Sequence, residues 1–115
     1  FKQDPATGQL LPGPALQTDE NLANKDLIDT FHTGLRSNEV VFGEKGKPGD
    51  VIVRLGTEKT PPPDATFVTW SLADDAPYYC VEPWMGPANA AGHKVGLHLV
   101  APGDTGKFTV SVNVK

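Results

Sequence analysis

The sequence contains one cysteine, no long apolar run and no cluster of basic residues, and each shortage excludes a class of protein. Cys80 has no second thiol in the chain, so neither an internal disulfide nor a cysteine zinc site can form. No apolar run approaches the roughly 20 residues that a membrane helix requires. The first residues also lack the basic and apolar pattern of a secretion signal. We therefore expect a cytoplasmic protein with no membrane partner.

The charges are balanced and scattered. Ten Lys and Arg residues stand against fourteen Asp and Glu residues, which gives a formal net charge of −4. No stretch gathers the basic side chains that would follow a phosphate backbone. The sequence therefore excludes nucleic acid as an expected partner.

Turn-forming residues are abundant, whereas apolar residues are few. The chain holds 12 Gly and 11 Pro, while apolar residues make up 38% of its 115 positions. Such a composition favours short strands joined by many turns, and the length allows one core only. Because the chain starts Phe1-Lys2-Gln3-Asp4, with no recognisable start of a domain, we expect it to be a fragment of a longer polypeptide.

The pattern of apolar and β-branched residues predicts an all-β, antiparallel meander or sandwich. Turn or proline-rich segments separate the predicted strands, and Pro61-Pro62-Pro63 cannot lie inside a sheet. The predicted strands are 39–42, 51–55, 67–71, 78–82, 96–100 and 107–114. The connections between them include 43–50, 60–64, 74–77 and 102–104.

The first third of the chain shows little regular pattern. Residues 1–21 predict an extended loop. Between Asn21 and Leu35, apolar residues at near-helical spacing predict one or two helical turns. Asn24 would cap this helix before Lys25, and Gly34 would end it.

Glu82 is the residue whose position most favours chemistry. It follows a hydrophobic strand and precedes Pro83, which we expect to end the strand and leave the carboxylate at a sheet rim. Flanking aromatic residues would partly desolvate the carboxylate and raise its pKa towards the range of a general base. The alternative is an ordinary solvated glutamate at the end of a strand.

Other candidates carry weaker signals. Trp84 offers a ring face to a sugar, or else packs beside a turn, whereas Trp70 is expected in the core. Asp26 reaches a sugar hydroxyl or is an exposed helix acid. No spacing indicates a metal site, so the three histidines are interpreted as surface or turn residues: His32, His93 and His98. No serine has the setting of a hydrolase nucleophile.

Residues 67–71 followed by 76–86 resemble the bacterial branch of the aldose 1-epimerase family. The shared string is Cys80-Val81-Glu82-Pro83-Trp84-Met85-Gly86, which is similar to the Cys-x-Glu-Pro-Trp-x-Gly segment of that branch. Two shorter downstream segments, 94–97 and 102–104, and the upstream segment 26–28 resemble the same branch in the same order. The resemblance covers roughly residues 20 to 115, and it implies that residues 1–115 are the C-terminal part of a single aldose 1-epimerase-like β-sandwich domain.

The resemblance implies a galactose mutarotase-like supersandwich that holds a hexose on a concave face. A glutamate at the position of Glu82 would take the proton of the anomeric hydroxyl, and a histidine would protonate the ring oxygen. No metal or organic cofactor is implied. Trp84, Asp26 and Asn89 would contact the monosaccharide; Asn89 stands where the branch usually has aspartate.

The family's catalytic histidines precede the region that matches, so the acid is expected from the remainder of the parent polypeptide. Two alternatives stay open from the sequence. A module that binds sugar without turning it over would keep Trp84 and need no acid. An immunoglobulin-like structural sandwich would need no site, but it would leave the Glu-Pro-Trp string unexplained.

Overall fold

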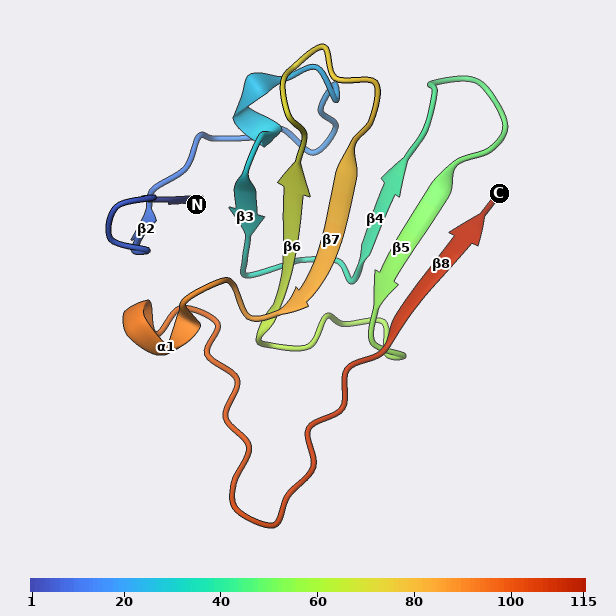
Figure 1. Ribbon diagram of the computed structural model, residues 1–115. Coiled ribbons are helices and arrows are strands. Elements are labelled where there is room, and N and C mark those ends of the chain that lie inside the picture. The colour runs from blue at the N-terminus through green and yellow to red at the C-terminus, as the bar shows by residue number, and fades with distance from the viewer.

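The computed structural model describes residues 1–115 and contains two antiparallel sheets with almost no helix (Figure 1). The five-stranded sheet has the order β2-β1-β3-β6-β7, and the three-stranded sheet has the order β4-β5-β8. Every strand pair is antiparallel. The strands are β1 Lys2–Gln3, β2 Leu10–Leu11, β3 Thr30–His32, β4 Glu39–Phe42, β5 Val51–Leu55, β6 Ala65–Trp70, β7 Cys80–Met85 and β8 Val110–Val114. The all-β, sandwich-like fold expected from the sequence is confirmed.

Two short helices complete the structure. The 3₁₀ helix η1 spans Lys25–Leu27, and Asn24 caps it as predicted, because its side chain accepts a hydrogen bond from the Asp26 amide. The α-helix α1 spans Ala90–His93 and was not predicted. With three and four residues, neither helix is long enough to cross a membrane.

The core lies where the inner faces of β5 and β6 meet, and it is small. Val53 and Leu55 pack there with Ala65 and Phe67. Only 15 of 115 residues are buried. The accessible surface is 7767 Å², whereas a compact monomer of this length exposes about 6,100 Å². The chain therefore leaves much more surface open than a self-contained domain does.

Several sequence expectations about the first half of the chain are wrong. Residues 1–21 are not a plain loop, because β1 and β2 form a small hairpin with Lys2 opposite Leu11. Gly34 does not end the helix, which stops at Leu27 because Thr30 already begins a strand.

The last third of the chain also differs from its prediction. Residues 96–100 form no strand, since no neighbouring strand pairs with them, and Leu99 is 78% exposed. The predicted strand 107–114 is shortened to β8, which begins at Val110.

The prediction that Pro83 ends its strand is also wrong. β7 continues to Met85, with Pro83 opposite Phe67 in β6. The Gly86 amide bonds to the Asp64 carbonyl at 2.7 Å, so in antiparallel alternation the even-numbered residues of β7 bond to β6. The backbone nitrogen of Pro83 therefore faces the free edge of the sheet, where a missing N–H breaks no ladder bond.

Candidate functional site

Glu82 and Trp84 lie side by side on the outer face of β7, the face turned away from the core. Their cross-strand partners are Val68 and Thr66, whereas Val81 packs against the core from the opposite face. Glu82 thus stands within the strand and not at its end. The strand's two-residue period explains why residues 82 and 84 share a face.

The two side chains are joined by a hydrogen bond. The indole Nε1 of Trp84 donates to Oε2 of Glu82 at 3.1 Å. Glu82 forms no ion pair, and its Oε1 has no hydrogen-bond partner within the chain. Trp84 is 37% exposed, so its ring remains available to a ligand. This pair offers a free carboxylate oxygen beside an accessible aromatic surface.

The other two predicted sugar contacts lie far from each other. Asp26 belongs to η1, at the end of the sheet where β6 finishes. Asn89 precedes α1 at the opposite end, and its side-chain amide donates to the Gly8 carbonyl at 3.1 Å. Six residues of β6 separate the two ends, a span of about 17 Å or more at 3.3 Å per residue. One monosaccharide cannot contact both residues in this arrangement.

None of the three histidines is bonded to Glu82. His93 is fixed within its own turn, where Nε2 donates to the Ala88 carbonyl at 2.8 Å and Nδ1 accepts from the Val95 amide. The Nδ1 of His98 lies 3.0 Å from Oδ2 of Asp64 on the surface. His93 therefore holds a turn and His98 is exposed, as the sequence suggested.

His32 is different, because it lies in β3 and is half-buried. Its Nε2 lies 2.8 Å from the Thr69 hydroxyl, which donates to the Leu27 carbonyl at 2.7 Å. Because that hydroxyl proton is already committed, the ring must carry its proton on Nε2 when neutral. Burial, with the positive charges of the N-terminus and Lys2, lowers the pKa of His32. Expecting a surface or turn histidine here was wrong.

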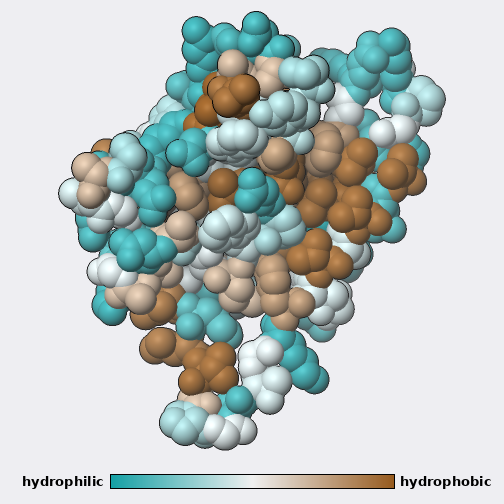
Figure 2. Space-filling model, in the orientation of Figure 1, coloured by the Kyte–Doolittle hydropathy of each residue, from teal (hydrophilic) through white to brown (hydrophobic).

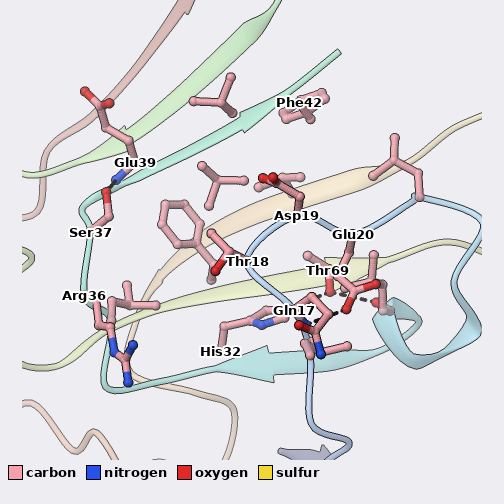
Figure 3. A pocket seen from close by; sticks show the side chains of 18 of the residues that line it. Gln17, Thr18, Asp19, Glu20, His32, Arg36, Ser37, Glu39, Phe42 and Thr69 are labelled. Atoms are coloured by element: carbon pink, nitrogen blue, oxygen red, sulfur yellow. Dashed lines mark hydrogen bonds between the residues drawn. The ribbon is translucent and has the colours of Figure 1, made fainter. Parts of the chain in front are cut away.

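His32 lines a cavity of about 850 Å³ between the inner faces of the strands and residues 16–22 (Figure 3). The floor is apolar, with Phe67 and Val81 among its residues, and Tyr79 lies beside Thr69 in the wall. Burial raises the pKa of Tyr79. Sequence reasoning missed this cavity because its walls come from segments far apart in the chain. Glu82 does not line it.

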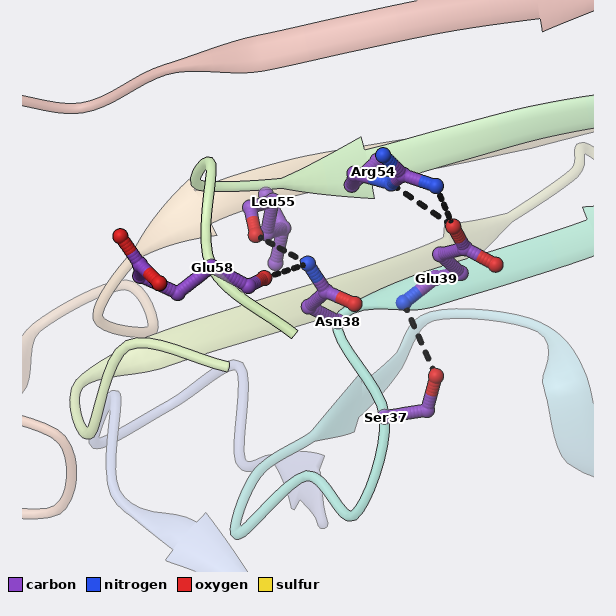
Figure 4. Close-up of polar contacts among 6 residues, drawn as sticks. All are labelled: Ser37, Asn38, Glu39, Arg54, Leu55 and Glu58. Atoms are coloured by element: carbon purple, nitrogen blue, oxygen red, sulfur yellow. Dashed lines mark hydrogen bonds and ion pairs between the residues drawn. The ribbon is translucent and has the colours of Figure 1, made fainter. Parts of the chain in front are cut away.

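A separate cluster of polar contacts joins β4, β5 and the segment after β5, and it stabilises the fold (Figure 4). The buried amide of Asn38 donates to the carbonyls of Leu55 and Glu58, at 3.1 and 2.6 Å. Glu39 pairs with Arg54 across the β4–β5 ladder. These contacts fasten the end of β5 to β4.

No family model matches the chain, and neither does any curated protein or solved structure.

Proposed function

We propose that the chain carries the base half of a sugar mutarotase site, in which Glu82 is the general base and Trp84 the platform for the sugar ring. The observation that carries the proposal is the Glu82–Trp84 pair on the open face of β7. The ring face suits the apolar C–H surface of a pyranose, and the carboxylate suits its hydroxyls. The resemblance of residues 80–86 to aldose 1-epimerases supports the same assignment.

The reaction interconverts the α and β anomers of an aldose, with a hexose as the expected substrate. The carboxylate of Glu82 takes the proton of the anomeric hydroxyl while an acid protonates the ring oxygen. The bond from C1 to the ring oxygen breaks, the C1–C2 bond rotates, and the ring closes on the other face of the carbonyl. Both protons then return, so the cycle needs no metal or organic cofactor. Each proton transfer contributes about 10²–10⁴-fold.

The acid of this site is proposed to come from the remainder of the parent polypeptide. His93 is held within its own turn, and His98 lies against Asp64 at the surface. His32 opens into a cavity on the opposite face of the sheet from Glu82. The excess surface of the chain leaves room for further elements. Asp26 is not retained as a sugar contact, since it lies at the end of the sheet away from Trp84.

The test is polarimetry of α-glucose and α-galactose with the complete gene product and its Glu82→Gln variant. Glutamine keeps the size of the side chain and its bond from Trp84 but cannot take the proton, so we expect the rate to fall about 10²–10⁴-fold. Glu39→Gln is the matched control, because that carboxylate pairs with Arg54 in the other sheet. Full activity in Glu82→Gln contradicts the proposal.

One observation favours a second candidate, a module that binds carbohydrate without converting it. No acid of the chain is bonded to Glu82, so residues 1–115 alone should bind sugar at Trp84 without accelerating mutarotation. Saturable binding by the complete product, lost in Trp84→Ala and unaccompanied by acceleration, would select this candidate. Turnover by the 115 residues alone would contradict the argument that the acid is missing.

A further inference from the structure

The outermost strand of the smaller sheet, β8, has an edge that nothing in the chain covers. β8 pairs with β5 only, with Val112 opposite Val53. Its sequence, Val-Ser-Val-Asn-Val, has no charge and no proline. Edges of folded proteins normally carry such features, because bare edges recruit other strands.

The direction of the free backbone groups follows from the bonds next to β8. The Lys115 amide donates to the Asp50 carbonyl at 2.9 Å, and the Gly56 amide donates to the Thr109 carbonyl at 2.8 Å. Odd-numbered residues of this segment therefore bond to β5, and by antiparallel alternation the even-numbered ones point away. Three alternate residues thus present free N–H and C=O groups at the edge: Val110, Val112 and Val114.

The same three valines form an open apolar stripe. Their cross-strand partners belong to the inner face of β5, which packs on the core. No strand of the larger sheet covers β8, so Val112 is 62% exposed and Val114 71% exposed. Apolar side chains accordingly gather over the β5–β8 part of the surface (Figure 2).

The free edge of β7 makes a useful contrast. The outward-facing position at its middle is Pro83, which has no N–H to offer to a new strand. Glu82 adds a charge beside it. Of these two outer strands, β8 is therefore the one built to accept a strand, and β7 is blocked.

We propose that the edge of β8 is a strand-addition site, and that its occupant is an extended, uncharged strand of alternating β-branched residues from the remainder of the parent polypeptide. The inference rests on the proposed function, which already requires that remainder. The added strand would bond to the outward groups of Val110, Val112 and Val114 and lay its own apolar side chains beside the valine stripe.

The exposed area favours this occupant over a second copy of the chain. The surface exceeds that of a compact monomer by about 1,700 Å², about twice what each partner buries in a standard interface. Pairing of β8 with β8 of a second copy, centred on Val112, would close the edge but leave the valine face open. A longer segment of the same polypeptide can pair with the edge through one strand and cover the valine face with the residues that follow it.

The test compares amide hydrogen exchange in the 115-residue chain and in the complete gene product. We expect the amides of Val110, Val112 and Val114 to exchange at least tenfold more slowly in the complete product, while those of Ser111 and Asn113 are protected in both. Equal exchange of the valine amides in the two proteins overturns the inference. Protection within the 115-residue chain that rises with its concentration indicates a second copy and also overturns it.

A proline substitution tests the same edge without relying on exchange. Val112→Pro removes an N–H that bonds to nothing in the chain, so it should leave the thermal midpoint of the 115 residues nearly unchanged. In the complete product it should lower the midpoint by several degrees, whereas Val112→Thr, which keeps the N–H, should not. Equal effects of proline and threonine in the complete product overturn the inference.

Neither measurement uses catalysis, so the two proposals fail separately. Activity that depends on Glu82, together with unprotected β8 amides, removes the strand site and keeps the mutarotase. Protected β8 amides without activity that depends on Glu82 would remove the mutarotase and keep the strand site.

Discussion

The hydroxyl of Thr66 offers a sharp test of the packing, because it is buried without a partner. Thr66 is fully buried in the middle of the larger sheet, and its Oγ1 has no hydrogen bond. A buried hydroxyl left unpaired costs about 1–3 kcal/mol in proteins. Thr66→Val replaces it with a methyl group of similar shape and keeps the β-branch that suits a strand. We therefore expect the variant to be about 1–3 kcal/mol more stable than the wild type.

The expected shift is large enough to measure by thermal unfolding. A chain of 115 residues has an unfolding entropy of about 0.24 kcal/mol/K, so the midpoint should rise by about 4–12 °C. Thr69→Val is the matched control, because that buried hydroxyl bonds to Leu27 and His32. Losing those bonds should cost about 1–3 kcal/mol. A midpoint in Thr66→Val that is unchanged or lower would refute the reasoning and show that the hydroxyl is satisfied in solution.

Two further predictions concern titration and backbone geometry. Because burial and the positive charges near it lower the pKa of His32 below about 6.5, the unfolded chain binds that proton more tightly. The free energy of unfolding should thus be highest above pH 6.5 and fall as the pH drops below it. Thermal midpoints measured across this range should fall less in His32→Gln than in the wild type. An equal fall in both proteins would show that another group causes the pH dependence. Gly86→Ala should cost more than about 2 kcal/mol, because φ is 77° and the new Cβ would lie 2.5 Å from the Gly96 carbonyl oxygen. Gly34→Ala, at φ 60° in open space, should cost only about 1 kcal/mol in denaturant unfolding, and equal costs would contradict the clash.

The β4–β5 hairpin shows what the sequence alone could predict. Its strands, 39–42 and 51–55, were predicted to the residue, because apolar alternation ends at a turn rich in glycine and proline. Both signals are local, and the pairing adds nothing that contradicts them. The same holds for the Asn24 cap, which depends on one side chain and an amide two residues later.

Predictions that depended on strand neighbours failed. Residues 96–100 have an apolar pattern, but a strand needs a partner, and no strand lies beside them. A proline would interrupt the hydrogen bonds of a central strand. Pro83 does not interrupt β7, because its nitrogen faces the free edge of the sheet. Sequence pattern does not say which strand will be outermost.

The candidate site also combines contacts between residues close in the sequence with contacts between distant segments. The pairing of Glu82 with Trp84 is local, since two residues apart on a strand means one face. It was not predicted, because Pro83 was expected to end the strand at Glu82. The cavity around His32 was not predicted either, because residues 16–22 fold across β3, β6 and β7 to make it. The resemblance placed Asp26 and Asn89 together with Glu82 at one sugar. In the structure, the six residues of β6 hold Asp26 and Asn89 at opposite ends of the sheet.

The two proposals together constrain what the rest of the polypeptide must supply. β4 and β5 lie between β7 and β8 (Figure 1), so a strand added at β8 extends the smaller sheet away from Glu82. That strand cannot bring an acid to the sugar on the outer face of β7. In the proposed mutarotase, the acid must therefore arrive on a separate segment that crosses the larger sheet near Trp84. If the rest of the polypeptide supplies only an edge strand, that strand would pair with β8 but Glu82 would still lack an acid. The protein would then bind sugar without converting it.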